Sequence, residues 1–581
     1  MGCCLMKKIT QLFMGLILVL APLSAQDFCS LVHIPLEQRM AHADVVISAK
    51  LMRQECFRDL RDNRIYTRNF LVPQAAWKGL SSLPAAFEMI TEGGMLDGEG
   101  MSYTNTLMPQ LGDEGIWLLY KDANRGGFLP YASLQGMLRK QEDAYYDYNG
   151  KHLGKAVDFM DMPAVLPEKQ VSPKPSSSAQ TITAGAINFS PKTAIAGIGQ
   201  VLAVTGSGFG ATQGSGYVAL NPNGMGFSDP IVSATFRYIS WSDTKIEVEI
   251  PSGFSTKIRV VGSSGVQEST DTLRILANVS MRQYNPADFF YLNNQNTAGG
   301  YYWTMHHDIR NNSAAKQATE DVFRHFRCRT GVHYTLQNSG TSARFNLGDN
   351  VQSVAFDTAG SEMAAGIVAR YEQLWSSCIL GSVTFYYVRS QELRFSSKFD
   401  YYYGTGAVPA GKTKFRYVMM HELGHSLQLG HVNEEGQTMH PVVDNLPAIK
   451  WNKRDTLTKE EIQAGSYLVQ QSRNFSFRAC GLLPMLEPAN CNDVYGSASS
   501  LADRVHVNLE VYPNPAGDEL SIRGLTAGVF SYCLFSSEGK LLRRGTADSG
   551  NNVSLQGLPS GCYFLSLNMG GSQSMHKVLK Q

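Results

Sequence analysis

Three histidines and one glutamate lie in a short stretch whose spacing could hold a metal ion. His421 and His425 are four residues apart, which in an α-helix at about 100° per residue places them about 40° apart on one face. Both imidazoles can therefore point at one atom. Neutral imidazoles are good zinc ligands, and a catalytic zinc has three protein ligands and one position open for water. His431 is the expected third ligand.

Glu422 and Gly430 complete the stretch. Glu422 directly follows the first histidine, where its carboxylate could take a proton from water and pass it to a leaving amine. Zinc lowers the pKa of a bound water to about 7 and polarises a carbonyl, so this chemistry is possible at neutral pH. We expect the helix to end after Leu429, and Gly430 to take the left-handed turn that returns His431 to the ion.

A buried helix that carries histidines only for packing is the competing interpretation. An accidental His-Glu-x-x-His in a chain of this length has odds of roughly one in a hundred, and a suitably placed third histidine lowers them roughly fifty-fold. Three converging imidazoles without a metal would also leave buried nitrogens in need of other partners. The metal site is therefore the favoured interpretation, with one Zn²⁺ as cofactor; the sequence gives no indication for or against Ca²⁺.

The same residues resemble the zinc motif of the metzincin metalloproteases, most closely its matrixin branch. His421-Glu422-x-x-His425 is followed by His431 and, eight residues later, by Met439. The resemblance implies that the three histidines bind zinc, that Glu422 is the general base, and that Met439 lies in a tight turn forming an apolar floor beneath the metal.

The sequence departs from the family pattern at two positions. Gln428 stands where the family has glycine, and Pro441 stands where some metzincin branches carry a tyrosine. Further on, Thr458 and Glu461 have the spacing of a capping box. They begin a stretch that resembles the last helix of a matrixin domain.

Other elements must hold the metal-binding helix in place. Residues 314–326 have helical spacing, and their apolar stripe is Ala315, Ala318, Val322 and Phe326. Residues 351–356 and 383–388 read as strands of one sheet. We expect 383–388 to be an edge strand, which could align an extended peptide by strand addition. Together with the resemblance, this predicts a metzincin-like α+β domain over residues 279–475, with a mixed sheet and three helices.

The chain length and charge restrict the remaining possibilities. With 581 residues, several domains are expected. The 51 basic and 50 acidic residues nearly cancel, so no overall attraction to nucleic acid or to an anionic membrane is expected. Residues 1–25 read as a secretory signal peptide with cleavage before Gln26, and we expect no transmembrane segment in the mature chain.

All-β domains are expected on both sides of the metal-binding domain. Residues 27–165 carry strand patterns at 43–50, 65–72 and 115–120, typical of a barrel-like N-terminal β domain; a propeptide role stays open. Residues 166–182 read as an extended linker. Residues 183–276 have short strands between glycine turns and resemble an immunoglobulin-like TIG (IPT) domain.

The C-terminal part resembles a sorting domain. Residues 505–581 read as a small antiparallel β-sandwich, and Tyr512-Pro-Asn-Pro515 and Gly561-Cys-Tyr563 match the C-terminal sorting domain of the type IX secretion system of Bacteroidetes. The resemblance implies passage through the outer membrane by that machinery, and a secreted or surface-attached product. A terminal carbohydrate-binding sandwich is the alternative.

The cysteine content fits an exported protein. Of ten cysteines, two precede the apolar core of the signal peptide, and the even number that remains indicates disulfides. Pairing by proximity would join Cys29 with Cys56, Cys328 with Cys378, Cys480 with Cys491, and Cys533 with Cys562. Cys480, in a linker over residues 476–504, could instead be a latency cysteine like that of matrixins; the disulfide is favoured because Cys480 follows the catalytic stretch.

The resemblances together imply a secreted zinc endopeptidase that acts on proteins or peptides. The alternative is a surface adhesin in which the TIG-like domain binds and the metalloprotease fold is an inactive scaffold.

Overall fold

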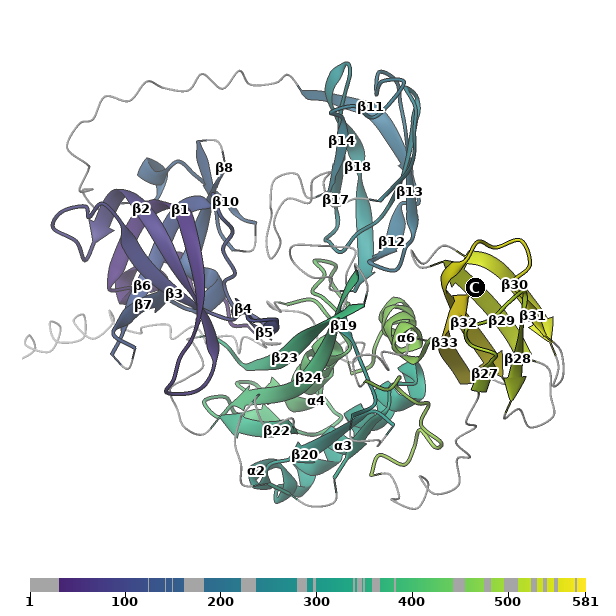
Figure 1. The fold of residues 1–581 in the computed structure, drawn as a ribbon. Coiled ribbons are helices and arrows are strands. Elements are labelled where there is room, and N and C mark those ends of the chain that lie inside the picture. The colour runs from purple at the N-terminus through teal and green to yellow at the C-terminus, as the bar shows by residue number, and fades with distance from the viewer. Residues whose placement is uncertain are drawn as a thin grey trace, which may run out of the picture.

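The computed structural model describes most of the chain between residues 31 and 581. The described ranges are 31–160 (without 124, 142 and 149), 182–220, 237–279, 290–341 (without 296–298 and 338–339), 347, 351–357, 366–380, 383–441, 455–474, 482–495, 510–523, 530–536, 541–547, 552–569 and 572–581. The predicted signal peptide and nearly all of the linker at 166–182 lie outside these ranges. Strands dominate the described residues, with five α-helices among them (Figure 1).

The N-terminal unit, which we define as residues 31–160, is built on one sheet and a short helix, α1 (Leu36–His42). The sheet order is β10-β9-β8-β6-β1-β2-β3, with β7 paired to β6. Its strands are β1 (Val45–Arg58), β2 (Ile65–Lys78), β3 (Phe87–Glu92), β6 (Glu114–Asp122), β7 (Gly127–Pro130), β8 (Met137–Gln141), β9 (Ala144–Tyr146) and β10 (His152–Gly154), with short 3-10 helices at Ser133–Gly136 and Ala156–Asp158. The strand patterns predicted at 43–50, 65–72 and 115–120 fall in β1, β2 and β6.

A second sheet follows between residues 182 and 278. Its order is β14-β17-β18-β11-β13-β16-β15, with β12 paired to β18. The strands are β11 (Ile182–Ser190), β12 (Thr193–Ala196), β13 (Val201–Thr205), β14 (Tyr217–Leu220), β15 (Tyr238–Trp241), β16 (Lys245–Glu249), β17 (Thr256–Gly262) and β18 (Gly265–Asn278). Most of these strands are short, as the sequence predicted, but β18 has 14 residues. The TIG assignment stays a prediction.

The third sheet packs against the helix that contains His421 and His425. It includes two strands from the N-terminal unit. Its order is β21-β20-β22-β24-β23-β5-β4, with β19 paired to β24. The strands are β4 (Gly94–Leu96), β5 (Glu99–Tyr103), β19 (Phe290–Tyr291), β20 (Tyr301–Met305), β21 (Tyr334–Leu336), β22 (Gln352–Asp357), β23 (Ala369–Leu380) and β24 (Val383–Ser396). Pairing is parallel from β21 to β24, and β23 runs antiparallel to β24.

The prediction that residues 383–388 form an edge strand is wrong. These residues begin β24, where β23 pairs with them on one side and the short β19 pairs with Tyr386 and Tyr387 on the other. The sequence pattern reports which faces of a strand are apolar and carries no information on which strands lie beside it. The outer strand is β23, and β5 covers its free side.

Three longer helices pack with this sheet: α3 (Ser313–Thr330), α4 (Phe415–Ser426) and α6 (Lys459–Asn474). The short α2 (His307–Arg310) precedes them, and β25 (Tyr401–Tyr402) pairs with β26 (Thr413–Lys414) just before α4. In α3 the predicted apolar stripe is buried. Asn312 caps its start, and Gly331, at φ 76°, ends it in the left-handed conformation.

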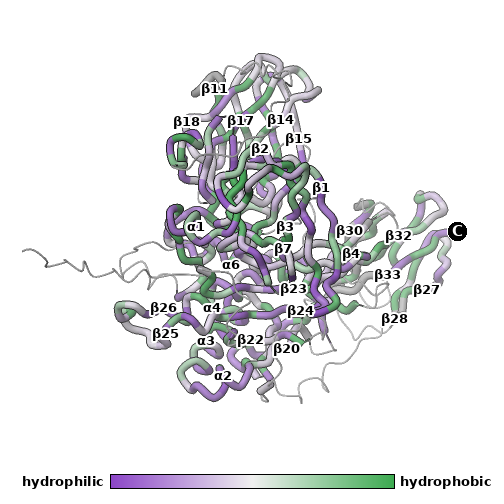
Figure 2. The backbone as a smooth tube through the Cα atoms, turned by 90° about the vertical axis from the view of Figure 1, so that its left-hand side faces the viewer, coloured by the Kyte–Doolittle hydropathy of each residue, from purple (hydrophilic) through white to green (hydrophobic). Residues whose placement is uncertain are grey.

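One continuous core connects the second sheet, the third sheet and these helices, from Ile187 to Val494. In the second sheet, hydrophobic and hydrophilic residues alternate along β17, whose buried positions face this core (Figure 2). The last strands of the chain form two further small sheets. One of these strands, β33, lies beside α6 (Figure 1). These strands are β27 (Glu510–Tyr512), β28 (Glu519–Arg523), β29 (Phe530–Ser536), β30 (Leu541–Ala547), β31 (Val553–Ser554), β32 (Gly561–Met569) and β33 (Ser572–Lys580). Within the described ranges, no helix is both long and apolar enough to span a membrane.

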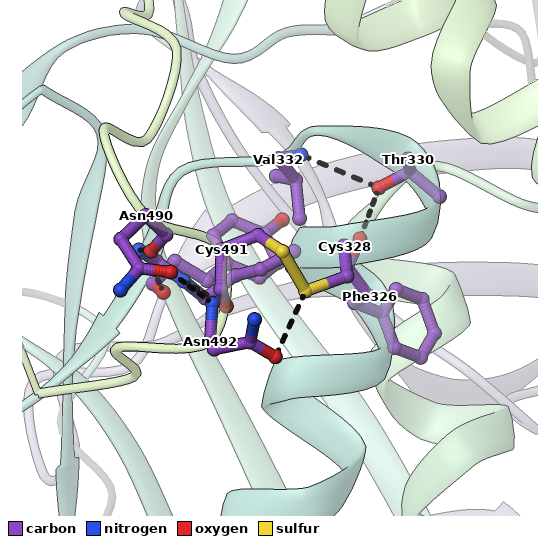
Figure 3. Close-up of a disulfide and its surroundings, with 9 residues drawn as sticks. Phe326, Cys328, Thr330, Val332, Asn490, Cys491 and Asn492 are labelled. Atoms are coloured by element: carbon purple, nitrogen blue, oxygen red, sulfur yellow. Dashed lines mark hydrogen bonds between the residues drawn. A yellow bond between two sulfur atoms is a disulfide. The ribbon is translucent and has the colours of Figure 1, made fainter.

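A disulfide joins Cys328, near the end of α3, to Cys491 (Figure 3). Arg327 strengthens the same junction, because its guanidinium donates to the carbonyl oxygens of Tyr334 and Asn490 at 2.7 and 2.8 Å. Residues 482–495 therefore pack onto the third sheet, where the nitrogen of Leu336 also donates to the carbonyl of Val494.

The cysteine pairs predicted from proximity in sequence are wrong. Cys328 and Cys491 bond to each other, so neither bonds to its expected partner. Cys56 and Cys562 are free thiols, which excludes the two other predicted pairs. Cys378 is disulfide-bonded, whereas Cys29 and Cys480 lie outside the described residues. Folding brings residues 163 positions apart into contact, a relation that sequence proximity cannot reveal.

We expect the Cys328–Cys491 bond to stabilise the fold by restricting the unfolded chain. Its loss in a Cys328→Ala/Cys491→Ala double variant should lower the free energy of unfolding by about 2–4 kcal/mol. Urea denaturation would measure this, with Cys562→Ala as the control because that thiol is free. Equal stability of the double variant and the control would contradict the prediction.

Candidate metal centre

The three histidines converge on one point. The Nε2 atoms of His421 and His425 lie 3.1 Å apart, those of His421 and His431 3.2 Å, and those of His425 and His431 3.1 Å. His421 and His425 are buried, and His431 is half-buried. The structure therefore brings together all three histidines that the sequence singled out.

Backbone carbonyls fix the orientation of two of the rings. Nδ1 of His421 donates to the carbonyl of Thr438 at 2.7 Å, and Nδ1 of His425 donates to that of Leu429 at 2.8 Å. A carbonyl can only accept, so in the neutral rings Nδ1 carries the proton and Nε2 presents a lone pair to the centre. This is the orientation that metal-binding histidines adopt.

The donor set fits a zinc ion. Two Nε2 lone pairs that face each other at 3.1 Å cannot hydrogen-bond to one another, and a cation would satisfy them together with His431. Zn–N bonds of about 2.0–2.1 Å in a tetrahedral site place the ligand nitrogens about 3.3 Å apart, close to the separations in this structure. Among the described residues, no other His, Cys, Asp and Glu side chains form such a group.

Burial keeps these rings in the metal-binding protonation state. Burial lowers the pKa of His425 to about 4. Burial, together with the neighbouring His425 and His421, holds the pKa of His431 well below its usual value. Both rings are therefore neutral near pH 7, and a neutral imidazole is the form that coordinates a metal.

The turn after α4 differs from the one predicted. The helix ends at Ser426 and not after Leu429, and Gln428, at φ 56°, takes the left-handed conformation that was assigned to Gly430. Gln428 is thus left-handed at the position where the resemblance places glycine. Its side chain compensates, because Nε2 of Gln428 donates to Oε1 of Gln373 in β23 at 3.1 Å.

The segment that carries His431 is held by the end of β18. Asn278 binds it twice: its carbonyl accepts from the nitrogen of Gly430 at 2.7 Å, and its Nδ2 donates to the carbonyl of His431 at 3.2 Å. The second sheet therefore helps to position the third histidine. No local pattern in the sequence indicates this contact.

Met439 lies in the turn that supports His421. Met439 is buried and packs against α4, where a Cβ on Gly424 would lie 2.5 Å from its sulfur. The nitrogen of Met439 donates to Oε1 of Glu461 at 2.8 Å. Glu461 and Thr458 form the predicted capping box at the start of α6. The start of α6, the turn and the ring of His421 are thus connected.

Glu422 is fully buried on α4, next to His421. Its Oε2 accepts a hydrogen bond from Oγ1 of Thr104 at 3.2 Å. Thr104 directly follows β5, so it comes from the N-terminal unit. Tyr371 of β23 also contacts the centre, because its ring stacks on that of His425 with 6.5 Å between centroids. Sequence reasoning identified neither Thr104 nor Tyr371, since neither belongs to a local motif.

A buried helix on a mixed sheet carries two of the three converging histidines, with a carboxylate beside the first, and the third histidine follows the turn after the helix. This arrangement is typical of a metallopeptidase. Comparison with protein families agrees. Residues 300–464 match the Matrixin family, and residues 510–581 match the Secretion system C-terminal sorting domain. The chain thus contains a matrixin domain, and its sorting domain indicates type IX secretion to the cell surface or beyond. No curated protein matches the chain.

We expect zinc to stabilise the folded chain through these histidines. A ligand that binds only the folded state at 100 times its Kd adds about 2.7 kcal/mol of stability. Zn²⁺ added after chelation should therefore raise the melting temperature of the wild type and leave that of His431→Asn unchanged. The control is His42→Asn, at an exposed position away from the centre, which should respond like the wild type.

The left-handed turn predicts a second effect. Gln428→Val should weaken zinc affinity about 10-fold, because a β-branched residue is strained at positive φ and would displace the Leu429 carbonyl that orients His425. Gln428→Gly keeps the turn and serves as the control. Competition with a chromogenic zinc chelator would measure both affinities, and wild-type affinity in the valine variant would refute the role of the turn.

Proposed function

We propose that the protein is a secreted zinc-dependent endopeptidase. The observation that carries the proposal is the set of three Nε2 atoms within 3.2 Å of one another, with the carboxylate of Glu422 on the helix that carries His421 and His425. The matrixin match supports a metallopeptidase. The substrates would be proteins or peptides outside the cell or at its surface, where the sorting domain directs the chain.

His421, His425 and His431 would hold the ion. When bound, zinc supplies a water of lowered pKa and polarises the carbonyl that is attacked. The carbonyls of Thr438 and Leu429 keep two of the rings in the tautomer that leaves Nε2 free of protons. Asn278 restrains the backbone at His431. The protein therefore provides an ordered set of three donors with little rearrangement.

Glu422 would act as the general base. Its carboxylate would remove a proton from the attacking water and deliver it to the amine of the departing peptide. Its burial excludes bulk water, which strengthens the attraction between the carboxylate and a cation held by the adjacent histidines. Thr104 orients Oε2 in the present conformation.

Export would depend on recognition of residues 505–581 by the type IX secretion machinery. The small sheets formed by β27 to β33 provide a folded surface for that recognition. The core of these sheets includes Leu520, Leu534, Leu565 and Val578. The catalytic and sorting roles thus lie in different parts of the chain.

Replacing the proposed base tests the mechanism. Glu422→Gln keeps the shape of the side chain and removes the proton acceptor, so kcat should fall about 10²- to 10⁴-fold while zinc content stays at one ion per chain. Hydrolysis of a fluorogenic peptide library and zinc analysis of the same samples would measure both. Glu460→Gln, on α6, is the control. Unchanged hydrolysis in Glu422→Gln would remove Glu422 from the mechanism, and a zinc-loaded wild type without hydrolysis in any form would favour the adhesin alternative.

A further inference from the structure

A strand of the N-terminal unit occupies the outer edge of the third sheet. β5 pairs antiparallel with β23, with Tyr103 opposite Glu372 and Glu99 opposite Ser376. β4 continues the same sheet beyond β5 (Figure 1). An exposed strand edge offers backbone groups to which an extended peptide can add. Here the chain itself fills that position.

The end of β5 reaches the metal centre. The nitrogen of Thr104 donates to the carbonyl of Tyr371 at 3.0 Å, and the nitrogen of Tyr371 donates to Oγ1 of Thr104 at 2.9 Å. The same hydroxyl donates to Oε2 of Glu422. Thr104 therefore connects the outer strand with the proposed base, in a place that an incoming peptide would need.

The chain leaves the extended conformation directly after Thr104. Asn105 has a left-handed φ of 57°, and both Asn105 and Thr106 are buried. Oδ1 of Asn105 and Oγ1 of Thr106 have no hydrogen-bond acceptor or donor within reach among the residues that the structure describes. The segment thus enters as a strand and turns away, so it does not continue as an extended substrate would.

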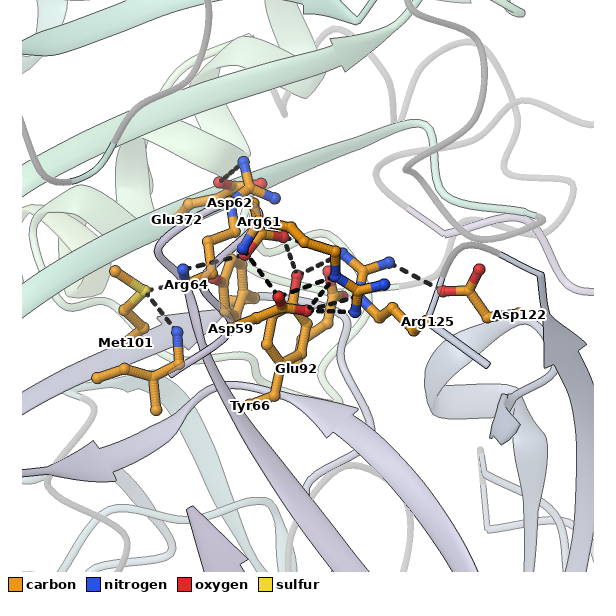
Figure 4. Close-up of polar contacts among 12 residues, drawn as sticks. Asp59, Arg61, Asp62, Arg64, Tyr66, Glu92, Met101, Asp122, Arg125 and Glu372 are labelled. Atoms are coloured by element: carbon orange, nitrogen blue, oxygen red, sulfur yellow. Dashed lines mark hydrogen bonds and ion pairs between the residues drawn. The ribbon is translucent and has the colours of Figure 1, made fainter. Parts of the chain in front are cut away.

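Buried charges hold the N-terminal unit against β23. The guanidinium of Arg370 is fully buried and binds Glu92 at 2.8 Å and Glu372 at 2.6 Å. Arg64 lies 3.7 Å from Glu372, and Figure 4 shows Arg64, Glu92 and Glu372 gathered at this junction. At the other end of β5, Arg389 of β24 binds Glu99. Undocking would leave these buried charges without their counterions. The ion pairs therefore favour the docked state.

We propose that residues 99–104 are an internal inhibitory strand, so that the chain in this conformation is latent. The proposal rests on the proposed function of the metal centre. The strand and a peptide substrate would compete for the edge of β23 and for the carboxylate of Glu422. Hydrolysis would then require β5 to separate from β23. The apparent rate of hydrolysis would be proportional to the fraction of molecules in which β5 is separated.

Gly100 offers a way to displace the strand. A Cβ at this position would lie 1.9 Å from Cζ2 of Trp375. The Trp375 ring cannot easily yield, because it packs against Phe290 and Tyr386 with centroids at 5.1 and 5.5 Å. Valine is well tolerated in strands generally, so Gly100→Val should disfavour docking and leave the N-terminal unit folded. The control is Gly517→Ala, where no heavy atom lies within 4 Å of an added Cβ.

A second variant tests the same step through charge. Glu99→Lys would replace attraction to Arg389 and Arg58 by repulsion, since Glu99 contacts both guanidinium groups. Its control is Glu88→Lys, which reverses a charge in the same unit at a half-exposed pair with Arg68. A variant that does not unfold cooperatively is not correctly folded and is left out. The other displacing variant then tests the proposal.

The experiment compares the zinc-loaded full-length variants in two assays. The first is hydrolysis of a fluorogenic peptide library, and the second is binding of a fluorescent peptide hydroxamate, which chelates the metal and needs no hydrolysis. We expect Gly100→Val and Glu99→Lys to raise kcat/KM and hydroxamate affinity roughly 10-fold or more, the size expected from overpacking a close contact. Both controls should match the wild type.

The two assays separate the possible failures. Equal hydroxamate affinity in the wild type and in both displacing variants would overturn the inhibitory strand, whether or not peptides are cleaved. Increased hydroxamate affinity without hydrolysis in any variant would support the strand and contradict the proposed endopeptidase.

Discussion

The structure around the candidate metal centre depends on three imidazole Nε2 atoms that meet at one point. Carbonyl oxygens of Thr438 and Leu429 fix the ring orientations of His421 and His425. Without a cation, such an arrangement places electron-rich atoms in contact inside the protein, which is unfavourable. The local fold is therefore best understood as a binding site built in advance, in which backbone contacts offset the cost of bringing the nitrogens together.

Contacts from different parts of the chain hold the segments around the histidines. Asn278, at the end of the second sheet, holds the segment of His431, and the start of α6 holds the Met439 turn through Glu461. Gln373 of β23 supports the left-handed Gln428. The short helix α4 is buried against α3 and β23. Several elements thus form the centre together, and loosening one of them would change the positions of the histidines.

The N-terminal unit adds a further layer to this arrangement. Its β5 completes the third sheet, and its Thr104 touches the carboxylate that is proposed to handle protons. Buried ion pairs at Arg370 and Glu372 make the contact specific: burial raises the pKa of Glu372, but Arg370 and Arg394 more than offset this and hold it below its usual value. A charged pair of this kind favours one docked geometry over other ways of covering the strand edge.

Local chemistry in the sequence determined the histidine helix, the stripe of α3, the Thr458–Glu461 capping box and the two segments with family resemblance, because each depends on residues within a few positions of one another. The tertiary structure alone decided which strand lies at the edge of the third sheet, which cysteines pair, and that Gln428 takes the left-handed turn in place of Gly430. These outcomes depend on contacts such as Thr104 with Glu422 and Cys328 with Cys491, whose members are far apart in the chain. Periodicity and spacing describe a segment and its own faces, whereas the neighbours of that segment are set by the packing of the whole molecule.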